Sequence, residues 1–264
     1  MGTVQRGGRV VHYTQVGAGP GVVLVPGLGS GALLFGTLPR RFARAGFTCC
    51  AVDPVGLEPS SPLPDGVFDF GEAAEDVRAV AATLPQPAAL IGTSLGGKVA
   101  LAAAAAAARS AAPGRLVLLS SSALPTPRGR RIHRWFELLC TEVDARLLGE
   151  LTAPFLFGET FLNARPGVVD DIVRSQKPTE ETRALMRAQA VALQAFDGTQ
   201  LCARVAWPTL CLAGAEDVLT LPSEVSATAK HIAGAQYHCI AGAGHSLLLE
   251  SALAFDRVVA FLRN

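Results

Sequence analysis

The chain has 264 residues, of which 50% are hydrophobic and 17% are charged, and its formal net charge is +1. This length suits one large domain with room for an insertion, and the composition excludes disordered and fibrous proteins. The nearly neutral charge predicts neither nucleic acid nor an anionic membrane as a partner. The first nine residues lack the long apolar stretch of a secretory signal, so we expect a cytoplasmic protein.

Short β-rich runs alternate with helical runs along the first half of the chain. The second half repeats this alternation after residue 197. Strands flanked by helices are typical of a mostly parallel sheet covered on both faces, here of about eight strands. The predicted strands are 9–16, 22–25, 47–52, 88–91, 116–119, 209–213 and 236–240. The predicted helices are 38–45, 70–84, 95–109, 223–232 and 250–262.

The stretch 124–197 breaks the alternation, because it holds no clear strand. Helical segments are predicted near 132–148, 167–175 and 180–195. We interpret the stretch as a helical cap inserted into a core of residues 1–123 and 198–264. Its apolar residues either line a substrate pocket or only join the cap to the core; they are Trp135, Phe136, Phe155, Leu156, Phe157 and Phe161. The predicted substrate-binding residues are Trp135, Phe136 and Leu219.

Two further features have structural explanations. The alanine-rich run from Val99 to Ala108 is about half as long as a bilayer-spanning helix, so we expect a buried helix packed on the sheet. The cysteines form no C-x-x-C pair and have no histidines clustered near them, so we expect no metal site and no cofactor. Small buried thiols in a reducing compartment explain them. The cysteines are Cys49, Cys50, Cys140, Cys202, Cys211 and Cys239.

The central motif runs from Gly92 to Gly96 and reads G-T-S-L-G, which fits the nucleophile elbow G-x-S-x-G. Such an elbow turns sharply from strand to helix and lifts the serine hydroxyl above the edge of the sheet. Glycines flank the serine because a Cβ would clash in the crowded turn. The apolar strand before the motif and the helical run after it are the expected context. Ser94 is therefore the candidate nucleophile.

A serine nucleophile needs a base, and the base needs an orienting acid. Among five histidines only His245 lies in a predicted loop, after a strand and before the last helix. Loops at the carboxyl ends of parallel strands are where open α/β sheets place function. Either Glu216 or Asp217 could be the acid, and we favour Asp217. The order Ser94, Asp217, His245 is the order expected of this triad in an α/β-hydrolase.

With these motifs the chain resembles the α/β-hydrolase superfamily over nearly all of its length. The stretch 24–29 resembles its oxyanion loop, and 214–217 and 242–245 resemble its acid and histidine loops. Within the superfamily the chain is similar to small capped esterases, enol-lactone lactonases and acyl-carrier ester hydrolases. The resemblance implies an oxyanion hole made by the backbone N–H groups of Leu28 and Leu95.

The chain departs from the family pattern at two places. Pro26-Gly27 stands where the family often has His-Gly, so a side chain that usually braces the loop is missing. The stretch 53–60 reads D-P-V-G-L-E-P-S, where the family often has D-x-R-G-x-G-x-S. We therefore expect different bracing of the loops near the site.

The leading hypothesis is a serine hydrolase that cleaves a carboxylic ester, lactone or thioester through an acyl-enzyme. The apolar cap favours a hydrophobic small-molecule acyl substrate, with an acyl carrier as a possible partner. One alternative keeps the site in an acyltransferase, a cyclase or a carbon–carbon bond hydrolase, because fold and triad do not decide the chemistry. Another is a non-enzymatic ligand-binding protein, against which the intact triad argues. The oligomeric state is left open.

Overall fold

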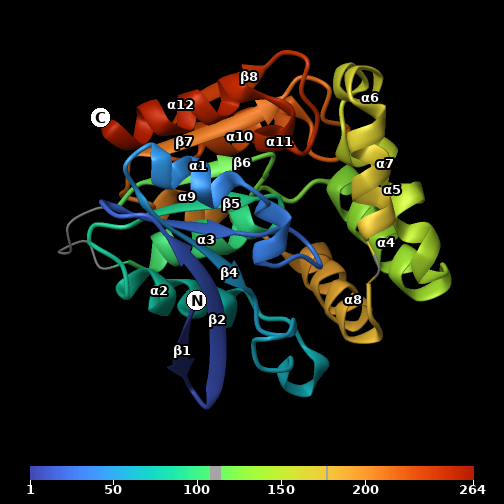
Figure 1. Ribbon diagram of the computed structural model, residues 1–264, viewed down its shortest axis with the longest axis horizontal. Helices are drawn as coiled ribbons and strands as arrows, with labels where there is room; N and C mark the ends of the chain where they lie inside the picture. The colour runs from blue at the N-terminus through green and yellow to red at the C-terminus, as the bar shows by residue number, and fades with distance from the viewer. Residues whose placement is uncertain (108–113, 177) are drawn as a thin grey trace.

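A computed structural model describes residues 1–107, 114–176 and 178–264. These residues form an eight-stranded sheet of order β1-β2-β4-β3-β5-β6-β7-β8, with helices on both faces (Figure 1). All neighbours from β4 to β8 are parallel, whereas β1 pairs with β2 and β2 with β4 in antiparallel fashion. The mostly parallel sheet is confirmed. The strands are β1 (Gly2–Arg6), β2 (Arg9–Val16), β3 (Gly21–Val25), β4 (Thr48–Asp53), β5 (Ala89–Thr93), β6 (Leu116–Leu119), β7 (Thr209–Gly214) and β8 (Gln236–Ile240).

The central strands are apolar because both faces of the sheet are covered. In β3, Val22 and Leu24 join the core on one face, while Val23 and Val25 join the core on the other. Such continuous apolar runs are typical of strands buried between two helical layers. Burial on both sides fixes the register of the sheet and thus the positions of the loops at its carboxyl edge.

Two groups of helices cover the two faces. One face carries α1 (Leu38–Arg44), α11 (Leu247–Glu250) and α12 (Ala252–Arg263). The other carries α2 (Phe70–Ala82), α3 (Leu95–Ala106), α9 (Thr199–Arg204) and α10 (Pro222–Lys230). The alanine-rich α3 is buried at every residue from Leu95 to Ala105. Its small side chains let it lie close to the sheet directly behind the nucleophile turn.

Most of the chain between β6 and β7 is helical. In Figure 1, α4 to α7 stand together at one side of the sheet, and α8 leads from them back to the core. Helices α4 and α8 pack against each other. The described residues of the stretch 124–197 contain no strand; its separation as a cap domain stays a prediction. The helices are α4 (Pro127–Glu142), α5 (Leu148–Leu156), α6 (Glu159–Ala164), α7 (Pro166–Ser175) and α8 (Glu180–Ala195).

Several predicted helix ends were wrong. The predicted helix 132–148 is two helices, because α4 stops where Val143 takes extended angles (φ −100°, ψ 142°). Its start is earlier, at Pro127, where the Thr126 hydroxyl accepts the Gly129 N–H at 2.8 Å as a helix cap. The last helix is interrupted in the same way, since extended Ser251 separates α11 from α12.

Other differences concern short or partly described elements. Strand β1 was not predicted; it is a five-residue edge strand whose side chains are alternately half-buried and exposed. Helix α3 ends at Ala106, and the predicted end at Arg109 lies outside the described residues. None of the described helices combines the length and the apolar character needed to cross a membrane. All six cysteines are free thiols, and five of them are buried, with Cys239 exposed.

Candidate active site

The turn between β5 and α3 is a strained elbow centred on Ser94. Ser94 has φ 54° and ψ −119°, a conformation that non-glycine residues seldom adopt without a functional reason. A Cβ on Gly92 would lie 2.2 Å from the Gly96 carbonyl oxygen, and one on Gly96 would lie 2.2 Å from the Val25 carbonyl oxygen. The two flanking glycines are therefore required by backbone contact, as the motif predicts. Ser94 itself is partly exposed.

The backbone of the elbow is fixed by the loop after β6. The Ser94 N–H donates to the Leu119 carbonyl oxygen at 2.9 Å, and the Ser121 hydroxyl donates to the Ser94 carbonyl oxygen at 2.7 Å. Lys98, one helical turn into α3, donates from Nζ to the Ser122 carbonyl oxygen. Burial lowers the pKa of Lys98 to about 8. These contacts fix the backbone of the nucleophile turn and do not involve the Ser94 hydroxyl.

His245 and Asp217 form a buried hydrogen-bonded pair. His245 Nδ1 lies 2.9 Å from Asp217 Oδ2, and the two residues are 7% and 2% exposed. The other carboxylate oxygen accepts the N–H groups of Leu219 and Thr220, each at 2.9 Å. Three contacts therefore fix the carboxylate on the imidazole. A carboxylate held in this way orients the ring and stabilises it when it becomes protonated.

The three candidate residues follow strands whose carboxyl ends open at one edge of the sheet. Ser94 directly follows β5, Asp217 comes after β7, and His245 comes after β8. The acid loop and the histidine loop are in close backbone contact, because a Cβ on Gly214 would lie 2.2 Å from the Gly244 carbonyl oxygen. The fold thus brings the acid and the base into contact and places the serine at the same edge.

Glu216, the alternative acid, points to a different partner. Its Oε2 accepts the Thr160 N–H at 2.9 Å, and its Oε1 accepts the Thr160 hydroxyl at 2.5 Å. These bonds, the hydroxyl first and then the N–H, lower the pKa of Glu216. Glu216 therefore ties the loop after β7 to α6, and the hydrogen bond to the imidazole comes from Asp217.

Glu250 holds the histidine loop, a role that sequence reasoning missed. Its Oε2 accepts the N–H groups of Gly158 and Gly244, and its Oε1 accepts that of Ser246, all at 2.8 Å. Burial raises the pKa of Glu250, while the three N–H bonds oppose the rise. The residues on both sides of His245 are thus clamped to one carboxylate. The only sequence signal is an acid in the apolar run after His245.

The predicted oxyanion loop lies against Ser94. A Cβ on Gly27 would stand 3.6 Å from the Ser94 Cβ. The Leu28 N–H has no hydrogen-bond partner in the part of the chain that the structure describes. Leu95 is the first residue of α3, where no earlier turn supplies a carbonyl for its N–H. Both N–H groups are therefore available to an incoming oxygen.

Helix α8 also contacts the oxyanion loop. The Gly29 N–H donates to Gln189 Oε1 at 2.7 Å, and Gln189 is 1% exposed. A Cβ on Gly29 would lie 2.3 Å from Met186 Cγ, so Met186 packs directly on the loop. Asp53 Oδ1 accepts the Ala32 N–H at 2.7 Å further along. In this chain α8 and Asp53 therefore brace the loop; that the bracing differs from the family pattern stays a prediction.

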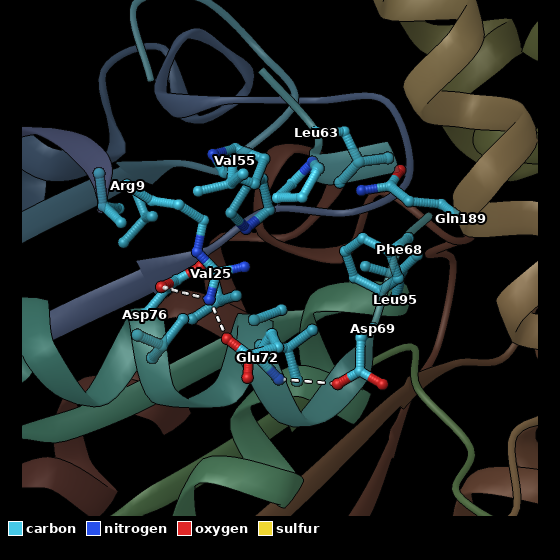
Figure 2. Close-up of a pocket in the computed structure, with 18 of the residues that line it drawn as sticks. Arg9, Val25, Val55, Leu63, Phe68, Asp69, Glu72, Asp76, Leu95 and Gln189 are labelled. Atoms are coloured by element: carbon cyan, nitrogen blue, oxygen red, sulfur yellow. Dashed lines mark hydrogen bonds and ion pairs between the residues drawn. The ribbon is translucent and has the colours of Figure 1, made fainter. Parts of the chain in front are cut away.

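A cavity of about 230 Å³ lies beside the oxyanion loop, and Figure 2 shows its lining. Its walls come from β2, β3, β4, the stretch 54–69, α2, α3 and Gln189 of α8. Pro26 and Leu95 line the cavity, and both lie close to Ser94: Leu95 follows it in the chain, and Pro26 is in the loop that lies against it. Arg9 and Gln189 stand on opposite sides of it (Figure 2).

The predicted substrate-binding residues are not among those that line this cavity. Trp135 packs on Phe136 and Phe155, with ring centroids 4.9 and 4.8 Å apart. Leu219 is buried, and its backbone N–H serves Asp217. None of the predicted three lines the 230 Å³ cavity. Their contact with a substrate stays a prediction.

Comparison with known proteins places the chain in a family. The family model of the alpha/beta hydrolase fold matches residues 20–252. Polyketide synthase ThaQ of Burkholderia thailandensis is 31% identical over 270 residues; the match covers 97% of this chain and only 12% of ThaQ.

Solved structures agree in architecture. A hydrolase from Pseudomonas aeruginosa PA01 has 26% identity and a TM-score of 0.83, covering 100% of this chain and 98% of that one. The enol-lactonase from Burkholderia xenovorans LB400 has 23% identity and a TM-score of 0.85, covering 100% of both chains. The chain therefore belongs to the α/β-hydrolase fold family and is an α/β-hydrolase enzyme.

Proposed function

We propose that the enzyme hydrolyses a carboxylic ester, lactone or thioester through an acyl-enzyme formed on Ser94. The observation that carries the proposal is the buried hydrogen bond between His245 Nδ1 and Asp217 Oδ2, in loops that open at the same sheet edge as the strained serine. A buried acid–imidazole pair at the same sheet edge as an elbow serine supports nucleophilic acyl transfer.

In the acylation step, the Ser94 hydroxyl oxygen attacks the substrate carbonyl carbon and its proton passes to His245 Nε2. The carbonyl oxygen becomes an oxyanion, which the N–H groups of Leu28 and Leu95 stabilise. One such donor is worth about 3 kcal/mol of the barrier. His245 then protonates the leaving oxygen or sulfur as the carbonyl–heteroatom bond breaks, and the acyl group remains on Ser94.

In the deacylation step, water takes the place of the leaving group. His245 removes a proton from the water as its oxygen attacks the acyl carbonyl, and returns that proton to Ser94 Oγ as the acid product leaves. Asp217 keeps its charge throughout and stabilises the protonated imidazole.

A second candidate function uses the same acyl-enzyme with another acceptor. The match of 97% of this chain to a segment of a polyketide synthase favours acyl transfer or cyclisation of a carrier-bound acyl thioester. In that case a hydroxyl or amine replaces water in the second step. Product analysis with and without an added acceptor nucleophile separates the two functions.

The test is a hydrolysis screen across p-nitrophenyl esters, lactones and acyl thioesters, with Ser94→Ala as the blank. We expect the wild type to cleave at least one of these classes and to be labelled on Ser94 by an alkyl phosphonate. Equal activity of Ser94→Ala, or no labelling and no cleavage of any class, would contradict the proposal.

A further inference from the structure

The cavity beside the oxyanion loop has an apolar interior. Its volume of about 230 Å³ is far larger than the few water-sized voids that a close-packed core tolerates. Apolar side chains and prolines from β2, β3, β4, the stretch 54–69, α2 and α3 make up most of its wall. These are Val11, Val25, Pro26, Val52, Pro54, Val55, Leu63, Pro64, Val67, Phe68, Ala73, Val77, Leu95 and Val99.

The two sides of the cavity differ in chemistry. Leu95 of the nucleophile turn and Gln189, which braces the oxyanion loop, lie on one side (Figure 2), and Pro26 of the oxyanion loop also lines the cavity. The other side carries Arg9, whose guanidinium contacts the carboxylates of Glu72 and Asp76 (Figure 2). Arg6 contacts the same two carboxylates, and the Arg9 Nε is buried with no hydrogen-bond partner among the described residues.

We propose that this cavity binds the apolar acyl chain of the substrate. The proposal rests on the hydrolase function proposed above and names the class of its substrate. Because Pro26 and Leu95 line the cavity and also flank Ser94, we place in it the acyl chain whose carbonyl the Leu95 N–H holds. A cavity of 150 Å³ holds a six-carbon ring, so 230 Å³ suits a chain of about eight or nine carbons. The chain should end before the ion cluster of Arg9, Glu72 and Asp76, because an apolar chain gains nothing by contact with charged groups.

Val77 offers the sharpest test, because it lines the cavity from α2 and is remote in sequence from the triad. Val77→Phe narrows the cavity and Val77→Ala enlarges it. Each buried methylene contributes about 0.8 kcal/mol, so kcat/KM of the wild type should rise about fourfold per added methylene until the cavity is full.

The experiment measures kcat/KM for p-nitrophenyl esters from acetate to dodecanoate. We expect the wild-type maximum near octanoate, a shift to shorter chains in Val77→Phe and a shift to longer chains in Val77→Ala. The octanoate-to-acetate ratio should fall at least tenfold in Val77→Phe. Val168→Phe, which adds the same bulk at an exposed position of α7, should keep the wild-type profile.

A second readout does not depend on turnover. Octanoate should raise the melting temperature of the wild type and of Val168→Phe, and not that of Val77→Phe. A chain-length profile that both Val77 variants leave unchanged, together with equal octanoate stabilisation of all variants, would overturn the acyl-chain assignment while leaving the hydrolase function intact. Absence of any esterase activity, with the octanoate effect as expected, would overturn the hydrolase function alone.

Discussion

The strands that carry the proposed triad and the helices between β6 and β7 are built differently. All of β7 and all of β5 except Thr93 are buried, and the edge strand β8 buries Ile240 just before the histidine loop. In contrast, α4 buries only Leu139 and Cys140 among its sixteen residues. Close-packed strands hold the side chains that follow them in fixed positions. The helices of the stretch 124–197 instead reach the site through a few side-chain contacts, such as Gln189 on Gly29 and Thr160 on Glu216.

This difference teaches that the proposed chemistry and its support come from separate parts of the chain. The sheet edge positions Ser94, Asp217 and His245, and the helices α6 and α8 brace the loops around them. Substitutions at the sheet edge should therefore abolish turnover. Substitutions in the helices should lower kcat only partly, or change the free energy of unfolding alone.

The largest effect in this comparison is expected at the acid. Asp217→Asn should lower kcat by about 10⁴-fold with little loss of stability, because the imidazole loses the anion that orients it. Glu216→Gln is the matched control, since its partner is Thr160 of α6, and it should cost less than about tenfold. Steady-state kinetics on one ester checks both variants. A larger loss in Glu216→Gln than in Asp217→Asn would show that the acid was wrongly chosen.

A smaller effect is expected where α8 meets the oxyanion loop. Gln189→Ala removes the acceptor of the Gly29 N–H and should lower kcat about 10- to 100-fold, because the neighbouring Leu28 N–H loses its fixed position. Gln194→Ala is the control, because Gln194 lies on the same helix and bonds Glu137 instead.

Kinetics and thermal melting together decide this case. The loss in Gln189→Ala should fall on kcat at nearly unchanged melting temperature, and Gln194→Ala should match the wild type. If both glutamine variants lose activity equally, α8 would act through general packing and not through the loop.

A third effect concerns stability and not turnover, and it comes from His133 in α4. Its Nδ1 is buried and has no hydrogen-bond partner among the described residues. Burial, and then the nearby Lys98, lowers the pKa of His133 to about 4. Because the unfolded chain titrates this group near 6.5, the unfolded state binds the proton more readily. The stability due to neutral His133 is thus present above pH 6.5 and is lost as pH falls towards 4.

Urea unfolding between pH 4 and pH 7 measures this loss. His133→Phe should remove up to about 3 kcal/mol of the acid-dependent decrease in the free energy of unfolding. An identical pH dependence in the variant and in the wild type would mean that the helical region does not lose stability through this histidine.

The same division explains what the sequence could predict. The elbow was predictable because local backbone contact requires its glycines. Asp217 and His245 were predictable because each follows a predicted strand in a glycine-containing loop. The paired Asp217 and His245 are only 28 residues apart in the chain. Their neighbourhood in the sheet follows from the alternation of strands and helices.

The supporting residues could not be predicted because their roles arise only on folding. Gln189 is 160 residues from the Gly29 N–H that it accepts, and Glu250 bonds Gly158, 92 residues away. Nothing in the composition of α8 separates Gln189 from Gln194. The break at Val143 was missed for a related reason, since apolar residues continue beyond it on both sides. Edge strand β1 was missed because five residues with one half-buried face carry little periodicity.

The central claim is that Ser94 and His245 act as one unit, and one set of measurements tests it most directly. We would compare kcat on a single good ester for the wild type, Ser94→Ala, His245→Ala and the double variant. Each single variant should lose about 10⁴- to 10⁶-fold, and the double variant should be hardly worse than either, because members of a triad are strongly non-additive. Losses that multiply in the double variant would show that the two residues work independently, and the triad would then have to be abandoned.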